Sequence, residues 1–248
     1  MPELPSAFFL ALVAATFALA GFVKGVSGMG LPTVAMGLLG SVMAPAAAAA
    51  LLVVPSFVTN VWQLAAGPDA RGLARRLAPM LAAIAAGTLF GAALLTGARA
   101  GASARALGVA LVAYAGWALL SPALAVPARW ERWLAPAVGF ATGLVTGATG
   151  VFVIPAVPYL QALRLDKDAL VQALGLSFTV STVALAAGLA LHGGLRPAQL
   201  GGSALAILPA LAGMALGQRL RARIGPRWFR IGFLVLLALL GMELALRG

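Results

Sequence analysis

Long apolar stretches separated by short basic clusters dominate the chain. A helix needs about 20 apolar residues to cross the bilayer core. Stretches of about this length without a charge occur at residues 4–23, 77–98, 106–128, 169–195 and 197–218, and a last helix can extend over 227–246. The longer stretches 25–68 and 133–163 are long enough for two passes and for one pass with a short helix, respectively. We therefore expect nine or ten membrane segments, two of them short.

The composition supports this interpretation. Hydrophobic residues make up 62% of the 248 residues and charged residues only 9%, whereas soluble domains are about 45–50% apolar and about 25% charged. So few ionic groups cannot cover a water-facing surface, and glycine and proline lie inside the apolar runs, as in polytopic membrane proteins. The predicted fold class is all-α, a polytopic integral membrane protein, and the lipid bilayer is an expected partner.

The net charge of +11 does not indicate nucleic-acid binding. The basic residues form short clusters between apolar runs, which is typical of cytoplasmic loops. We expect no nucleic-acid partner. The absence of cysteine excludes disulfides, thiolate metal sites and cysteine nucleophiles.

Three pairs of motifs suggest that the chain is duplicated, with residues 1–125 and 126–248 as two membrane repeats of about five helical segments each. Because five is odd, the second repeat is predicted to be inverted relative to the first. The matched motifs are Gly21-Phe22-x-x-Gly25 with Gly139-Phe140-x-x-Gly143, Ser27-Gly28 and Gly30 with Thr146-Gly147 and Gly150, and Gly87-x-x-x-Gly91 with Gly213-x-x-x-Gly217.

Basic residues predict the orientation. With ten segments and an external N-terminus, 13 of the 17 Lys and Arg residues lie on the inner side, and the other four are Arg99, Arg105, Arg196 and Arg247. If the short helices were instead re-entrant on one side, the split would be about 10 to 7. The inverted ten-segment arrangement follows the positive-inside rule better, so it predicts a multi-pass protein of a bacterial-type inner membrane with both termini external.

Two glycine-rich breaks, Lys24–Pro32 and Thr142–Gly150, are the candidate binding elements. Interrupted helices in matching places of two halves are typical of secondary transporters. The short helices predicted to start near Leu31 and Val151 would present free amides that favour an anion, with hydroxyls nearby as further donors. The alternative is that these glycines only allow helices to pack closely.

Polar residues inside apolar segments extend the candidate site. Lys24 either adds positive potential to an anion pathway or extends to the cytoplasmic interface from a helix end; its matching second-half residue is Thr142. A second group lies on one helix face, where Asn60 favours a hydrophilic cavity and the hydroxyls favour hydrogen bonds between helices. This face contains Ser56, Thr59, Asn60 and Gln63, and the corresponding later segment contains Ser177, Thr179, Ser181 and Thr182.

These residue types predict substrate binding and no catalysis. No metal-ligand spacing and no phosphate loop is present, and the single histidine, His192, gives no credible Ser–His–Asp set. We therefore predict a protein that is not an enzyme, with no metal and no cofactor. The predicted substrate-binding residues are Lys24, Ser27, Gly28, Gly30, Asn60, Thr146, Gly147, Thr149, Gly150 and Ser177.

The breaks also resemble a known family. The run from Gly139 to Pro155 and its weaker counterpart from Gly21 to Gly30 are similar to those of the TauE/SafE sulfite exporter family, also called the four-toluene sulfonate uptake permease family. The resemblance implies a secondary transporter, in the exporting direction, that moves sulfite, sulfonates or related organic anions by alternating access. A proton or sodium ion is a further expected partner, with no residue assigned to it. The alternatives are an anion channel and a non-transporting membrane scaffold.

Overall fold

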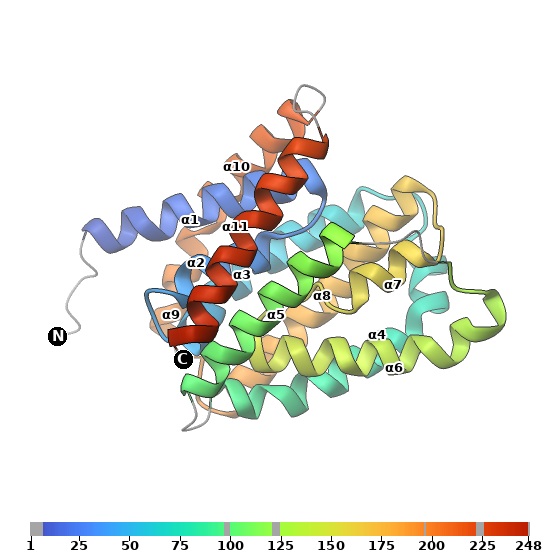
Figure 1. The fold of residues 1–248 in the computed structure, drawn as a ribbon, viewed down its shortest axis with the longest axis horizontal. Helices are drawn as coiled ribbons and strands as arrows, with labels where there is room; N and C mark the ends of the chain where they lie inside the picture. Colours follow the sequence, from blue (N-terminus) through green and yellow to red (C-terminus); the bar gives the residue numbers. More distant parts are fainter. Residues whose placement is uncertain (1–6, 97–99, 121–124, 196, 222–225, 248) are drawn as a thin grey trace.

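The computed structural model describes residues 7–96, 100–120, 125–195, 197–221 and 226–247. Every regular element in these ranges is an α-helix (Figure 1). The helices are α1 (Ala7–Ser27), α2 (Leu31–Gly40), α3 (Pro45–Ala65), α4 (Ala70–Thr96), α5 (Ala100–Leu120), α6 (Ala128–Thr149), α7 (Ala156–Ala162), α8 (Lys167–Leu191), α9 (Pro197–Leu205), α10 (Ile207–Leu220) and α11 (Pro226–Arg247).

Within the described residues, six helical spans are long and apolar enough to cross a membrane. They are α1, α3, α4, most of α5, α8, and the continuous span Leu200–Leu220 formed by α9 and α10. Helix α2 and residues Ile231–Leu246 of α11 are shorter apolar helices. The prediction of an all-α polytopic membrane protein is confirmed. The inverted relation of the two halves stays a prediction.

The first break lies inside the predicted range but is shorter, whereas the second lies later in the chain than predicted. Helix α1 continues to Ser27 and α6 to Thr149, so the breaks are residues 28–30 and 150–155. Helix α2 begins at Leu31 as predicted, but α7 begins at Ala156 and not near Val151. A glycine inside a helix costs only about 1 kcal/mol relative to alanine, which close helix packing can offset.

The predicted single helix at 197–218 is interrupted at Ala206, between α9 and α10. Pro209 explains the interruption, because it has no N–H to donate to the carbonyl of Leu205. Elsewhere the predicted segments match the helices to within several residues at each end. The first predicted segment begins outside the described residues and is helical from Ala7.

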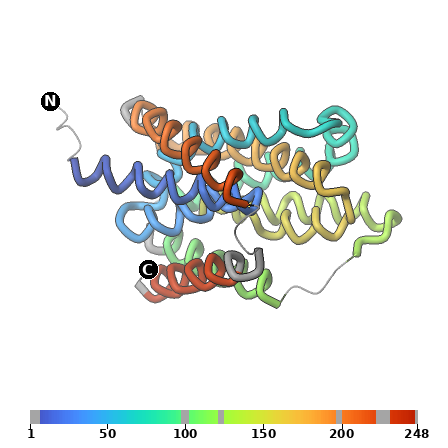
Figure 2. Tube along the Cα trace, turned by 90° about the horizontal axis from the view of Figure 1, so that it is seen from above, coloured from blue at the N-terminus to red at the C-terminus, as the bar shows by residue number. Residues whose placement is uncertain are grey.

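The main helix pairs join the two parts of the chain. Helix α1 packs on α10, α4 on α6, α3 on α8, and α5 on α11. Figures 1 and 2 both show α5 beside α11. Each pair takes one helix from residues 7–120 and one from residues 128–247. The two sequence halves therefore interlock and do not form separate bundles.

Glycine contacts show how paired helices run. Gly21 lies against Ala210 and Gly25 against Met214, so α1 and α10 are parallel. The C-terminal ends of α1 and α10 therefore lie at the same end of the bundle as the N-terminal ends of α4, α6 and α8. We call this end of the bundle the basic end. It contains Arg71, Arg75, Arg76, Arg129, Arg132, Lys167, Arg219 and Arg221.

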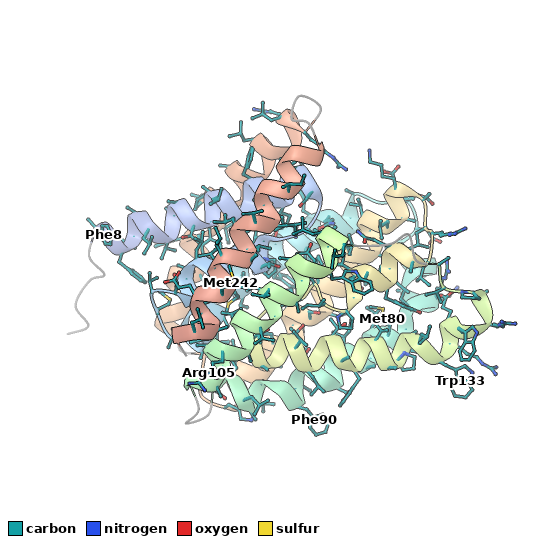
Figure 3. The ribbon with its side chains drawn as sticks, viewed as in Figure 1. Phe8, Met80, Phe90, Arg105, Trp133 and Met242 are labelled. Atoms are coloured by element: carbon teal, nitrogen blue, oxygen red, sulfur yellow. The ribbon has the colours of Figure 1, made fainter. Side chains whose placement is uncertain are left out.

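Arg105 lies at the opposite end of the bundle from Trp133 near the start of α6, as Figure 3 shows. Arg105, which the charge pattern predicts on the outer side, therefore lies at the opposite end of the bundle from the basic clusters. Arg99 and Arg196 of the same set lie outside the described residues. The membrane side to which the basic end belongs stays a prediction, as does the external position of the termini.

Candidate functional site

Lys24 lies in the last turn of α1 and is only 3% exposed. Its Nζ donates to Oγ1 of Thr59 at 3.3 Å and to Oδ1 of Asn60, both on α3. The Asn60 amide in turn donates to Oγ1 of Thr182 on α8 at 3.2 Å. Lys24, Thr59, Asn60 and Thr182, which we call the Lys24 site, therefore join three helices through buried polar atoms.

The Lys24 site has a positive charge without a negative partner. Among the described residues, Lys24 is the one charged side chain that is buried, and no Asp or Glu of these residues forms an ion pair with it. Its burial does not match the alternative in which the ammonium extends to the membrane interface. A buried cation with neutral partners alone is costly, on the order of several kcal/mol. An anion bound here would offset that cost.

Helix α3 reaches the site through a distorted segment. Pro55 lies inside α3 and has no N–H for the carbonyl of Leu51. The Ser203 hydroxyl of α9 donates to that carbonyl at 2.7 Å and accepts from the Val54 N–H at 3.0 Å. Ser203 thus stabilises α3 one turn before the Lys24 site.

Several buried hydroxyls in the described residues have no hydrogen-bond partner. Ser56 is one of them, and it lies one turn before Thr59 and Asn60 on the same face of α3. Ser177 and Ser181 are two others, but they share a face of α8 with Gly188, which contacts Ala92 of α4. Ser56 therefore lies beside the Lys24 site, whereas Ser177 lies on the face of α8 that it shares with Gly188.

Hydrogen bonds of Ser27 stabilise the backbone of the first break. The Ser27 hydroxyl lies 2.8 Å from the carbonyl oxygen of Val23 and 2.7 Å from that of Met29, and it accepts from the Met29 N–H at 3.3 Å. Gly28 and Gly30 have φ values of 79° and 101°, which glycine adopts without steric cost. Ser27 and the two glycines therefore shape the backbone between α1 and α2.

One glutamine connects this break to α8, and a second connects α8 to the end of α3. The Gln63 amide donates to the carbonyls of Gly28 at 2.8 Å and Val171 at 3.0 Å. The Gln172 amide donates to the carbonyl of Leu64 at 2.9 Å and accepts from the Asp69 N–H at 2.9 Å. We call Gln63 and Gln172 the amide bridge.

The amide bridge lies one turn beyond Asn60, toward the basic end. It therefore lies between the Lys24 site and that end. Helical periodicity predicts Gln63 on the polar face of this helix, whereas Gln172 was not predicted. A glutamine in the second turn of an apolar helix was the available signal.

The second break repeats the hydrogen bonds of the first. Thr149 Oγ1 donates to the Val145 carbonyl four residues earlier at 2.6 Å and accepts from the Val151 N–H two residues later at 3.2 Å, as Ser27 does. Gly150 has a φ of 72°, and its N–H donates to the Thr146 carbonyl at 2.7 Å, as that of Gly28 does to Lys24.

Ser27 and Gly28 therefore correspond to Thr149 and Gly150. By this register the counterpart of Lys24 is Thr146, and the predicted counterpart Thr142 is wrong by one turn. The Thr146 hydroxyl donates to the Val151 carbonyl at 3.2 Å. The hydroxyls of Thr146 and Thr149 are thus occupied by backbone groups of their own break.

Gly147 lies in the contact between α6 and α4. A Cβ at Gly147 would come within 2.3 Å of the Thr88 carbonyl oxygen on α4, and one at Gly25 within 2.2 Å of the Met214 carbonyl oxygen on α10. A Cβ at Gly150 would meet the side chain of Met36 on α2 at 2.9 Å. Of the predicted substrate-binding residues, the structure brings together Lys24 and Asn60, with Gly28 connected through Gln63.

No group of three or more metal-ligating side chains is found in the part of the chain that the structure describes. A family profile described as "Sulfite exporter TauE/SafE" matches residues 13–244 of the chain. Neither a curated protein nor a solved structure matches it. Because the match spans nearly the whole chain, the protein belongs to the TauE/SafE sulfite exporter family of membrane transporters.

Proposed function

We propose that the chain exports small sulfur oxyanions, sulfite or sulfonates, across the membrane by alternating access, and that it binds them at the Lys24 site. One observation is central to this proposal. The Lys24 side chain is buried with neutral oxygen partners, so a bound anion would supply the negative charge that balances its ammonium group. Membership in a sulfite exporter family supplies the chemical class of that ligand.

The bound anion would complete the hydrogen bonds of the site. An ammonium group has three N–H donors, and Lys24 directs two of them to Thr59 and Asn60. The third N–H and the Ser56 hydroxyl, which has no partner in the described residues, can both donate to sulfur-bound oxygens. Donors to an ionised group form hydrogen bonds about twice as strong as neutral ones.

The amide bridge is the proposed barrier between the Lys24 site and the basic end. Its hydrogen bonds are neutral, and each contributes about 0.5–1.5 kcal/mol net. They can therefore break and form again within a transport cycle, whereas buried ion pairs would resist opening. If the basic end is cytoplasmic, the barrier would open to admit an exported anion.

Counterflow in proteoliposomes tests this function. Vesicles loaded with unlabelled sulfite should accumulate labelled sulfite transiently, and the initial rate should saturate with concentration. An anion channel would pass current without counterflow, and a scaffold would show neither. Repeating the assay with an imposed proton or sodium gradient would identify the coupling ion.

The chain offers a matched control for the central residue. Lys24→Gln should abolish the counterflow, whereas Lys167→Gln, at the other lysine, which is exposed at the basic end, should leave it unchanged. Equal counterflow in both variants and the parent protein would remove Lys24 from the proposal.

A further inference from the structure

The Lys24 site also indicates which anions it can accept. We propose that it selects singly charged sulfur oxyanions, bisulfite or a sulfonate, and rejects doubly charged ones such as sulfate. This inference rests on the proposed function, because it assumes that the substrate binds at Lys24. It concerns the charge of the substrate, which family membership alone does not specify.

The charge of the site is the first argument. Helix α2, which packs on α1, and helix α3, to which Lys24 donates its hydrogen bonds, contain no charged residue. Helix α10 has Arg219 in its last turn, and α8 has Lys167 and Asp168 in its first turn; all three are exposed at the basic end. Within the described residues, the buried site therefore has a single positive charge, from Lys24.

The number of available donors is the second argument. The Asn60 amide already donates to Thr182, and the Gln63 amide to Gly28 and Val171. The described residues leave three donors at the site, namely one N–H of Lys24, the second N–H of the Asn60 amide and the hydroxyl of Ser56. One cation and few donors match one negative charge, whereas a dianion would remain with one buried charge unbalanced.

Methanesulfonate and sulfate form a matched pair of probes. Both are tetrahedral about sulfur, and they differ in that a methyl group replaces one charged oxygen. Because an unbalanced buried charge is costly, we expect sulfate to bind at least about 100-fold more weakly than methanesulfonate. Bisulfite should bind like methanesulfonate.

Thermal unfolding of the purified full-length protein in detergent measures this preference, since a ligand that binds only the folded state stabilises it by an amount that increases with the ratio of its concentration to its Kd. Increasing methanesulfonate should raise the unfolding temperature, and sulfate at the same concentrations and ionic strength should not. A sulfate affinity equal to or above that of methanesulfonate would overturn the proposed selectivity while leaving the transport proposal intact. No response to methanesulfonate, bisulfite or sulfate would contradict the proposed function itself, and the inference with it.

Variants at Lys24 complete the test. Lys24→Arg keeps the charge and should keep the preference for methanesulfonate, even if its affinity falls. Lys24→Gln should lose the response to methanesulfonate, and Lys167→Gln should behave as the parent. A Lys24→Gln protein that folds and still prefers methanesulfonate over sulfate would show that the selectivity arises elsewhere.

Discussion

The two helix breaks have nearly the same construction and different chemistry. In each, a hydroxyl residue ends a long helix, accepts from the N–H two residues later and is followed by a glycine of positive φ. At the residue four positions before that glycine, the first break has Lys24 and the second has Thr146. Lys24 reaches across to α3, whereas Thr146 bonds within its own break.

This difference distinguishes the residues that shape the break from the residue proposed to bind the anion. The backbone of a break can form with either residue, because the hydrogen bonds that shape the break do not involve the Lys24 side chain. The charge occurs once, and so does its amide partner Asn60. We infer that anion binding is concentrated on the first break and that the second break serves mainly to position α7 and α8.

The largest expected effect comes from making the first break like the second. Lys24→Thr should lower the initial rate of sulfite counterflow by about 100-fold or more, because a buried charged group and its hydrogen bonds are removed. Thr146→Val removes one hydroxyl bond to a backbone carbonyl and should change the rate by no more than about threefold. Similar losses in the two variants, at equal amounts of folded protein, would show that both breaks bind the anion.

A smaller effect is expected from the matched packing glycines. Gly25→Ala and Gly147→Ala each insert a methyl group within 2.3 Å of a facing carbonyl oxygen, and such overpacking costs about 1–3 kcal/mol. Both variants should therefore give less folded protein and a lower unfolding temperature. Gly116→Ala on α5 is the control, since its Cβ would meet nothing within 4 Å.

The glycine variants also test the original assignment of Gly147 to the substrate. If Gly147→Ala folded as well as the parent protein but did not transport, the substrate would have to contact the second break. Scintillation counting of counterflow beside size-exclusion analysis of the same preparation distinguishes the two outcomes.

The smallest effect is expected at the hydroxyl residues that end the two helices. Ser27→Ala and Thr149→Ala each remove hydrogen bonds to the backbone of a break, and each should cost about 1 kcal/mol. Thr149→Ser keeps the hydroxyl and should recover most of the loss. Thermal unfolding measures these changes, and a large effect of one alanine variant with none of the other would contradict the equivalence of the two breaks.

The helical membrane fold could be predicted because bilayer thickness determines the length of an apolar helix. The register of the repeat could not be predicted so well. Gly139, Gly143 and Gly147 recur every fourth residue along α6, so a sequence match can move by one turn without losing its glycines. Only the bonds of Thr149 and Gly150 to their own backbone identify the correct register.

The candidate site could be predicted only in part. Periodicity identified the polar face of α3 with Asn60, because residues of one helix have a known angular relation. It could not show that Lys24 contacts Asn60, since these residues are 36 positions apart on different helices. For the same reason Gln172 was missed, because its partners Leu64 and Asp69 belong to another part of the chain.

The interlocked helix pairs have a consequence for biosynthesis. Helix α1 is made first, but the surface that covers its glycines belongs to α10, nearly two hundred residues later in the chain. Neither half on its own contains both helices of any of the four main pairs described above, so nascent α1 has to remain in the membrane with that face uncovered by its final partner. Such late, long-range pairing makes folding slow and favours dependence on insertion factors. It also means that the two halves, if synthesised as separate chains, have to assemble with each other before either can reach its final packing.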